Sequence, residues 1–483
     1  MQPRPPVVTI LGHVDHGKTT LLDFIRKSHL AAKEHGGITQ RIGAYEISTG
    51  IKGYKTDKIT FIDTPGHEAF SLLRARGANV ADLAILIIDA KDSIMPQTIE
   101  SISHIKAAKI PFIVAINKVD LPEANPEKVK RELLKYDVQV EEQGGKVFAL
   151  PISAKTGKGV DELLESILLI TADLHLQYDP QGPLKAYIIE TKKGKQGILV
   201  ATIIKDGSLK IGETVFVDSI KTKVRSLIND LGQQINQIFP STPTEILGFD
   251  EMPNVGSEIS KLPPQAKAEI AASASGPKAI DMESFLHPKE EEKKLSLIIK
   301  ADSQGTLEAI ANSLVKKDNV EVILKGIGEI HKSDIFLAKT TKAIVIGFAV
   351  GMTPEVRDLA KQEQIIVKTY NVIYELLEEL NEVARLLKEK EEREKNVKGE
   401  AKVLATFVIE GEKIFGIKMT KGKANLGDEI ELYRKNKLIG KTKIVSLRIR
   451  AKTVQEVKKD QDAGIIFSPP LDIKVGDVIQ YVL

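Results

Sequence analysis

A chain of 483 residues with 42% hydrophobic residues exceeds a single hydrophobic core, and we expect roughly three or four domains. A net charge of +3 excludes a generally basic nucleic-acid binder, so such contacts must come from local patches, and the lack of cysteine excludes disulfides and thiolate metal sites. No apolar run reaches about 18 residues and the N-terminus has no apolar signal core, so we expect no membrane segment and a cytoplasmic protein.

The first predicted elements are a strand (Val7–Leu11), a loop (Gly12–Thr19) and a helix with apolar residues at helical spacing (Thr20–Arg26). Two glycines followed by Lys18 and Thr19 form the pattern of a phosphate-binding loop. A strand, loop and helix in this order direct backbone N–H groups at an anion. The alternative interpretation is a glycine-rich turn that binds no ligand. We predict that Lys18 reaches the β- and γ-phosphates and that Thr19 ligates Mg²⁺. The predicted phosphate-binding residues are Gly12, His13, Val14, Asp15, His16, Gly17, Lys18, Thr19 and Thr20.

Short apolar strands alternate with helical patterns from residue 4 to residue 172, which predicts a doubly wound α/β sheet. The expected strands are 59–62, 83–88, 112–116 and 147–150, and helices are expected at 127–136 and 161–172. Ligands of such sheets lie at the carboxyl ends of the strands. The segment Asp63-Thr64-Pro65-Gly66-His67 begins at such an end, so we predict that Asp63 holds Mg²⁺ through water and that Gly66 offers its N–H to the γ-phosphate.

Asn117–Asp120 follows the strand that ends at Ile116 and predicts a base-binding motif. The Asp120 carboxylate can accept hydrogen bonds from two N–H groups on one edge of guanine, which adenine lacks, and the Lys118 stem can lie along the base. The segment Ser153-Ala154-Lys155, after the next strand, can offer a backbone N–H to the base carbonyl. A surface turn is the alternative for Asn117–Asp120 alone, but its position after two phosphate motifs favours a site for GTP or GDP rather than ATP.

These four motifs resemble those of the translational GTPases. Gly36–Ala44 resembles the first switch of the bacterial translation initiation factor 2 family, and Arg74–Gly77 and Met95–Thr98 strengthen that match. His16 favours the bacterial form.

The resemblance implies roles for several residues. Thr39 would close on Mg²⁺ and the γ-phosphate, and His67 would orient the attacking water. Val14 and Ile38 would form an apolar gate that keeps His67 away until the ribosome repositions it, and Asp15 is a candidate for binding a monovalent cation. A histidine without a carboxylate partner suits a water-orienting role better than that of a strong base, whereas a solvated loop histidine is the alternative.

The linker Tyr178–Pro183 is followed by a region, 182–262, in which short strand patterns are separated by glycines. This pattern predicts a small antiparallel β-barrel. Its expected strands are 185–190, 197–204, 214–217, 223–228 and 244–247. Residues 263–293 are expected to be a connector and residues 294–369 an α/β domain, with strands at 343–347 and 364–367. The Gly305 turn in that domain is a candidate for a second nucleotide site, but it lacks the lysine and the glycine spacing of the phosphate-binding loop Gly12–Thr19.

A long helix is predicted from Tyr370 to Asn396, with an apolar stripe that ends at Leu387. The charged stretch that follows is typical of a solvated rod between domains. The last region, 399–483, returns to strands and contains partial repeats of the first barrel. Leu209–Val217 resembles Ala424–Leu432, and Lys223–Ile228 resembles Lys443–Arg448. We therefore expect a second barrel of the same type.

The last barrel departs from the family pattern. Ala463–Leu471 stands where the family has a cysteine, glycines, an asparagine and an aromatic residue, and Ala451–Thr453 replaces a usual acidic pair. No tRNA-binding residue is carried over here. The long N-terminal extension of the family is also absent from this sequence, which fits both a naturally short form and a trimmed chain.

The resemblance implies a monomeric GTPase with Mg²⁺ that binds both ribosomal subunits, ribosomal RNA and formylmethionyl initiator tRNA, and that promotes subunit joining. One alternative is an elongation-type or tRNA-carrier GTPase, in which two barrels directly follow the nucleotide domain. Another is a GTP-dependent ribosome-binding scaffold without catalysis, against which the presence of His67 argues.

Overall fold

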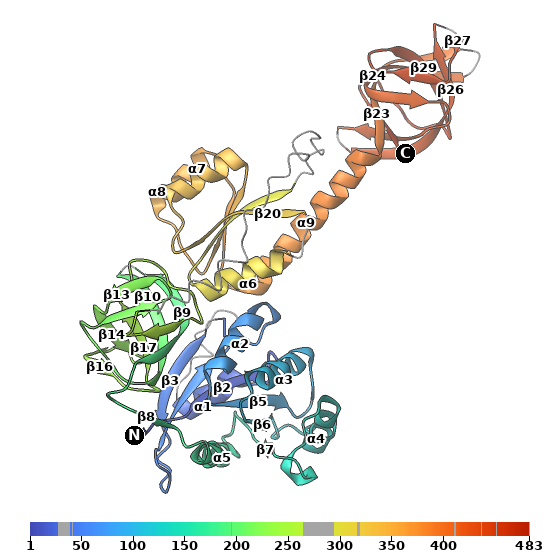
Figure 1. Ribbon diagram of the computed structural model, residues 1–483. Helices are drawn as coiled ribbons and strands as arrows, with labels where there is room; N and C mark the ends of the chain where they lie inside the picture. Colours follow the sequence, from blue (N-terminus) through green and yellow to red (C-terminus); the bar gives the residue numbers. More distant parts are fainter. Residues whose placement is uncertain are drawn as a thin grey trace, which may run out of the picture. The chain divides into compact units, whose positions relative to one another are not determined.

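The structure is a computed structural model that describes the chain except residues 28–38, 41, 195, 264–293, 316–318, 410–411, 436, 451 and 483. It divides into two compact units, Met1–Glu379 and Leu380–Leu483 (Figure 1). Ile38 of the predicted gate lies outside the described residues, as does nearly all of the predicted connector. Among the described residues no helix has the length and apolarity that crossing a membrane requires.

The N-terminal domain of the first unit is built on a sheet with the strand order β3-β4-β2-β5-β6-β7. Its strands are β3 (Gly43–Ser48), β4 (Lys58–Asp63), β2 (Val7–Gly12), β5 (Leu83–Asp89), β6 (Phe112–Asn117) and β7 (Phe148–Pro151). Every residue of β2 and β5 is buried, which is why these strands read as continuous apolar runs. All pairings are parallel except β3–β4, so the predicted doubly wound sheet is confirmed and carries an antiparallel edge strand.

Helices lie against both faces of this sheet (Figure 1). They are α1 (Lys18–Arg26), α2 (Ser71–Val80), α3 (Pro96–Ala108), α4 (Pro126–Leu133) and α5 (Val160–Asp173). Leu21 and Leu163 pack into the core on one face, and Ile102 and Val129 pack into the core on the other. The helix expected at 127–136 is α4 followed by a short 3-10 turn, Leu134–Tyr136.

The second domain is an antiparallel sheet with the order β13-β12-β18-β9-β10-β17-β14-β15, plus the pair β11–β16. Its strands are β9 (Lys185–Gly194), β10 (Gly197–Asp206), β11 (Leu209–Lys210), β12 (Thr214–Val217), β13 (Ile220–Lys223), β14 (Ser226–Asn229), β15 (Gln234–Ile235), β16 (Gln237–Ile238), β17 (Pro243–Leu247) and β18 (Glu258–Ser260). The single strand expected at 223–228 is wrong. The chain leaves β12 at Lys223 and pairs with β17 from Ser226, so two strands replace one.

A buried ionic cluster joins the first two domains. Arg4 donates to Asp82 at 2.6 Å, and Lys205 of β10 donates to the other oxygen of the same carboxylate at 2.8 Å. Burial opposes ionisation of Asp82, but Arg4 and Lys205 hold its pKa below the ordinary value. The Thr60 hydroxyl donates to the Ser241 carbonyl oxygen across the same junction. These contacts tie the second domain to the nucleotide domain.

The third domain has the parallel strand order β20-β19-β21-β22, with β19 (Leu295–Ala301), β20 (Val320–Ile327), β21 (Ile344–Phe348) and β22 (Val367–Tyr370). Its helices are α6 (Gln304–Val315), α7 (Lys332–Thr341) and α8 (Pro354–Gln362). The strand expected at 364–367 instead begins at Val367, because the chain turns after α8 with Gln364 at φ 56°.

The Gly305 turn is occupied from within the chain. Glu190 of β9 accepts hydrogen bonds from the Gly305 N–H at 3.2 Å and from the Ser303 hydroxyl at 3.0 Å. A carboxylate therefore already covers the first turn of α6, which agrees with the weak motif and argues against a second nucleotide site there.

The long helix α9 spans Ile373–Asn396, rather than beginning at Tyr370, which belongs to β22. Ile373, Leu376, Leu380 and Ala384 are buried at helical spacing. Leu386, which was expected on the apolar stripe, is 52% exposed. The buried residues Leu376, Leu380 and Ala384 follow one another at intervals of four, and Leu386 is not on the face that they share. The chain then passes directly into β23, which begins at Val397.

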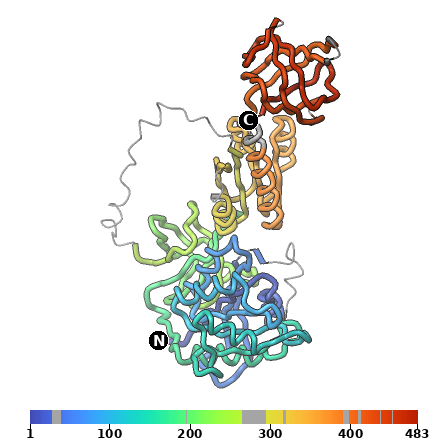
Figure 2. Tube along the Cα trace, turned by 90° about the vertical axis from the view of Figure 1, so that its right-hand side faces the viewer, coloured from blue at the N-terminus to red at the C-terminus, as the bar shows by residue number. Residues whose placement is uncertain are grey.

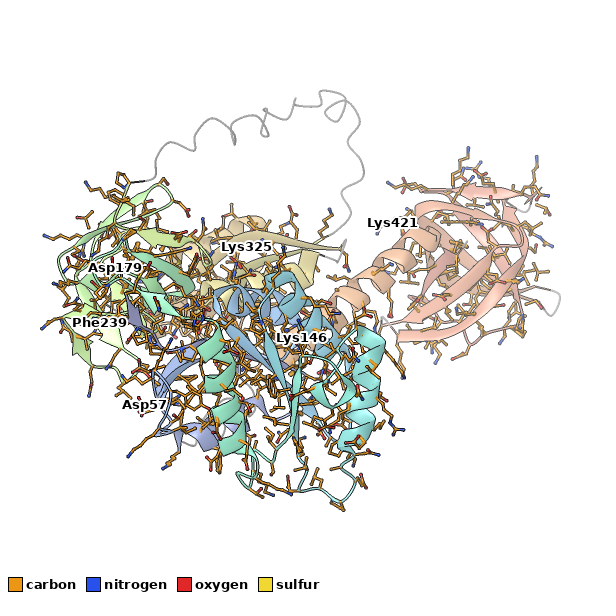
Figure 3. All side chains as sticks on the ribbon, turned by 60° about the horizontal axis from the view of Figure 1, so that its bottom comes forward. Asp57, Lys146, Asp179, Phe239, Lys325 and Lys421 are labelled. Carbon is orange, nitrogen blue, oxygen red and sulfur yellow. The ribbon has the colours of Figure 1, made fainter. Side chains whose placement is uncertain are left out.

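The second unit contains a closed β-barrel (Figure 2). Its strand order is β23-β30-β25-β26-β29-β24-β28, and the additional pairing of β23 with β24 closes the ring. The strands are β23 (Val397–Ile409), β24 (Glu412–Asn425), β25 (Glu429–Arg434), β26 (Lys437–Ile449), β27 (Lys452–Thr453), β28 (Glu456–Lys458), β29 (Asp462–Ser468) and β30 (Val478–Val482). Exposed basic side chains such as Lys421 lie on its surface (Figure 3). Most of the divergent segment Ala463–Leu471 is strand β29, and Pro469 and Pro470 follow the end of that strand, where proline costs no ladder hydrogen bond.

Candidate nucleotide-binding site

The predicted motifs of the first domain meet at the carboxyl ends of β2, β4, β6 and β7. There they surround a cavity of about 370 Å³. Its lining residues are Val14, Asp15, Gly17, Lys18, Thr19, Thr20, Thr39, Gly66, His67, Asn117, Lys118, Asp120, Leu121, Ala154 and Lys155.

The phosphate-binding loop is compact. The Lys18 ammonium, at the start of α1, donates to the Gly12 carbonyl oxygen at 3.1 Å and to the His13 carbonyl oxygen. Burial lowers the pKa of Lys18 to about 8, with the negative charge of Asp63 opposing, so the ammonium stays charged at neutral pH. Gly17 has φ 95°, and a Cβ there would lie 2.3 Å from the Asn117 side-chain nitrogen. Only glycine therefore suits this turn.

Three oxygen donors from separate segments converge beside Lys18. The Thr19 and Thr39 hydroxyl oxygens are 2.7 Å apart, and the Thr39 hydroxyl donates to Asp63 at 3.2 Å. Hydroxyl and carboxylate oxygens are ligands that Mg²⁺ accepts, alongside water and phosphate. The residues predicted for the metal therefore lie close together, as a magnesium site requires.

The base-binding loops are held together by side chains. Asn117 donates to the His16 carbonyl oxygen and accepts from the Ala154 N–H, both at 2.8 Å, so one amide connects three loops. The Ser153 hydroxyl donates to Asp120 at 2.7 Å, and this bond lowers the pKa of Asp120. The Ala154 N–H is bonded to Asn117 and the Ser153 N–H to the Lys158 carbonyl oxygen, so this segment is held from both sides.

His67 also lines the cavity, in the loop after β4. Its Nδ1 accepts from the Ala69 N–H at 2.9 Å, which caps the short helix Glu68–Phe70. Partial burial, with a smaller contribution from the Arg74 charge, lowers its pKa below the ordinary value. The imidazole is therefore neutral at pH 7, and because Nδ1 accepts, its proton is on Nε2.

A buried arginine holds this loop in place. The Arg74 guanidinium donates to the carbonyl oxygens of Pro65 at 2.9 Å and His67 at 2.6 Å, and it binds both oxygens of Glu100 on α3. Burial opposes ionisation of Glu100, but hydrogen bonds from His104 and other neighbours, Arg74 among them, lower its pKa to about 2. The contact between Arg74 and Glu100 is therefore an ion pair at neutral pH.

Several predicted residues lie behind the lining rather than in it. Gly12, His13, His16 and Pro65 contribute carbonyl oxygens to the contacts above, Asp63 and Ser153 bond to lining residues, and Thr64 donates to the Ile10 carbonyl oxygen. Val14 lines the cavity and its N–H donates to Gln97. The gate partner Ile38 lies outside the described residues.

Sequence reasoning missed several contributors. Leu121 lines the base end of the cavity, and its place directly after Asp120 was the available signal. Arg74 and Gln97 lie in the segments Arg74–Gly77 and Met95–Thr98, which were noted for their family resemblance, but their contacts depend on the fold.

Comparison with known families agrees with this geometry. Residues 4–173 match the model of the elongation factor Tu GTP binding domain, and residues 183–262 match elongation factor G domain 2. Fold and site together define a translational GTPase.

Residues 271–381 match the model of translation-initiation factor 2. The chain is 42% identical over 497 residues to translation initiation factor IF-2 of Thermotoga sp. (strain RQ2), covering 99% of this chain and 71% of that protein. The identity to the factor of Bartonella tribocorum is also 42%, over 99% of this chain and 59% of that protein. The chain belongs to the translation initiation factor 2 family, which confirms the resemblance. The crystal structure of GDP-bound aIF5B from Aeropyrum pernix aligns with all of this chain and 92% of its own, at 26% identity and a TM-score of 0.48.

Proposed function

We propose that this chain is an initiation factor that, with GTP bound, holds formylmethionyl initiator tRNA on the small ribosomal subunit. It promotes joining of the large subunit and hydrolyses GTP to GDP and phosphate on the ribosome. The observation that carries the proposal is that Thr19, Thr39 and His67 line one cavity, with Asp63 bonded to Thr39 directly behind it and the predicted base-binding loop lining the same cavity.

In this proposal Thr19, Thr39 and Asp63 hold Mg²⁺, which supplies positive charge to the phosphate oxygens when bound. Lys18, beside them, neutralises further phosphate charge. Asp15, which lines the cavity, is a candidate ligand for a monovalent cation. Phosphoryl transfer needs mainly positioning and electrostatic stabilisation, and the described residues supply both.

His67 orients the attacking water in this scheme. Its Nε2–H can donate to a water oxygen, whereas Nδ1 is used by the Ala69 N–H. Such a histidine positions water without removing its proton as a strong base would. Repositioning of His67 by the ribosome would then set the rate.

The elongation-type alternative is disfavoured by domain order. An α/β domain and α9 stand between the two β-rich domains in this chain, whereas in that class two barrels follow the nucleotide domain directly.

Binding of initiator tRNA tests the part of the proposal that concerns the final barrel. In a filter-binding assay with GTP, formylmethionyl initiator tRNA should be retained at least about tenfold more tightly than unformylated methionyl initiator tRNA, because a pocket built for one polar group rejects an analogue lacking it. Equal retention of the two tRNAs would contradict formyl recognition by this chain.

The second test concerns α9, which we propose to be a stiff spacer that carries movement toward the final barrel. The helix has 24 residues and, at a rise of about 1.5 Å per residue, a length of roughly 36 Å. Inserting Gly-Gly after Glu391 costs about 2 kcal/mol of helix propensity and should slow subunit joining, measured by stopped-flow light scattering, with GTP affinity unchanged.

An Ala-Ala insertion at the same position is the matched control. It changes helix length and rotation equally but keeps helix propensity, so the difference between the two variants isolates stiffness. Identical joining rates for the two insertions would show that stiffness of this segment is not required.

A further inference from the structure

The first turn of α9 contacts the predicted catalytic histidine. The ring of Tyr374 lies against the ring of His67, with centroids 4.2 Å apart and ring planes inclined by 54°. Burial, together with the negative charge of Asp15 in the phosphate-binding loop, raises the pKa of the Tyr374 hydroxyl. Tyr374, although 41% exposed, therefore contacts a residue of the cavity lining, and it comes from an element about 300 residues further along the chain.

The same turn of helix is bonded to the segment that carries Thr39. The Gln40 side chain donates to the Asn371 carbonyl oxygen at 2.8 Å and accepts from the Ile373 N–H at 3.0 Å. Ile373 is fully buried, so the turn that carries Tyr374 is anchored on its other side. If Thr39 moves when the bound nucleotide changes, the two Gln40 hydrogen bonds would therefore transmit that movement to the start of α9.

The contacts of His67 have two origins. Its Nδ1 bond to Ala69 and the bond of its carbonyl oxygen to Arg74 are made within the nucleotide domain. The ring contact with Tyr374 comes from α9, beyond the third domain. Among the contacts that His67 makes with described residues, the one with Tyr374 changes when α9 moves relative to the nucleotide domain.

We propose that Tyr374 is a positioning residue that restrains His67 in a resting orientation, and that the two Gln40 hydrogen bonds make this restraint sensitive to the nucleotide. The proposal rests on the water-orienting role of His67 given above. Rotation of the imidazole toward the γ-phosphate breaks the ring contact, so the contact opposes hydrolysis until α9 moves. Because coupling is reciprocal, a nucleotide that displaces Thr39 and Gln40 also loosens the start of α9.

Single-turnover GTP hydrolysis without ribosomes tests the restraint. Tyr374→Ala should raise the rate about two- to tenfold, the range that one aromatic contact supplies, with GTP affinity unchanged. Tyr374→Phe keeps the ring and should behave as wild type. In ¹³C-histidine-labelled protein, the His67 resonance should shift in Tyr374→Ala and stay in place in Tyr374→Phe. A general structural role of Tyr374 would not produce this difference between the two variants.

The double variant Tyr374→Ala with His67→Ala shows whether the effect runs through the histidine. It should lose the increase. The restraint would be overturned if the increase persisted in the double variant. It would also be overturned if Tyr374→Ala had a wild-type rate with an unshifted His67 resonance, or a rate below wild type. Failure of the proposed function shows separately, as wild-type turnover of His67→Ala on ribosomes, whereas failure of the restraint alone leaves that variant impaired.

Discussion

Asp120→Asn is expected to change the nucleotide preference of this protein from GTP to xanthosine triphosphate. The Asp120 carboxylate lines the base end of the cavity, and the bond from Ser153 lowers its pKa and keeps it ionised. An ionised carboxylate accepts from two N–H groups on guanine. An amide at this position can donate one hydrogen bond, which xanthine accepts at the carbonyl that replaces the amino group of guanine.

The size of the change should be large. A site built to hydrogen-bond a group rejects a ligand without it by about 10⁴ or more, so the GTP-to-XTP affinity ratio should fall by that order. Competition between the two nucleotides for the purified variant measures the ratio. Asp137→Asn, at an exposed turn of the same domain, is the matched control and should leave the ratio unchanged. A wild-type ratio in Asp120→Asn would rule out Asp120 as the guanine-selecting residue.

His67→Ala is expected to remove most of the ribosome-stimulated GTP hydrolysis while GTP binding is retained. A stabilising group supplied by a partner raises the rate of such enzymes by about 10³ to 10⁵, and we expect His67 to be the residue through which the ribosome acts. Binding should persist because the phosphate and base contacts lie on other segments, around Lys18 and Asp120.

Single-turnover hydrolysis on ribosomes, with binding measured separately, checks this expectation. His175→Ala is the matched control, because His175 is an exposed histidine of the same domain at the end of α5 and outside the cavity lining. Unaffected turnover of His67→Ala would show that another residue orients the water.

The nucleotide motifs were readable from sequence for a physical reason. Each is a contiguous loop that follows a buried strand, and in a parallel sheet the carboxyl ends of the strands lie at one edge. The residue types and their order in Gly12–Thr19, Asp63–His67 and Asn117–Asp120 therefore carry the chemistry of the site. The remaining site residues stay predictions, although the structure places them around or directly behind one cavity.

Strand boundaries were less accessible. The apolar pattern of Lys223–Ile228 is continuous, but the chain changes partners within it, from β12 to β17. Pairing partners come from elsewhere in the chain, so a local pattern cannot show where one strand ends and the next begins. The antiparallel edge strand β3 was unpredicted for the same reason.

By itself, the sequence determined a guanine-nucleotide domain, the β-rich domains on either side of an α/β domain, and the long helix, because each follows from residues adjacent along the chain. Only the tertiary structure decided what holds the loop that carries His67. Arg74 binds Glu100, and Tyr374 lies on His67, across sequence separations that no periodicity spans. Such contacts exist only once folding has brought distant elements together, since their energies depend on geometry rather than on sequence neighbours.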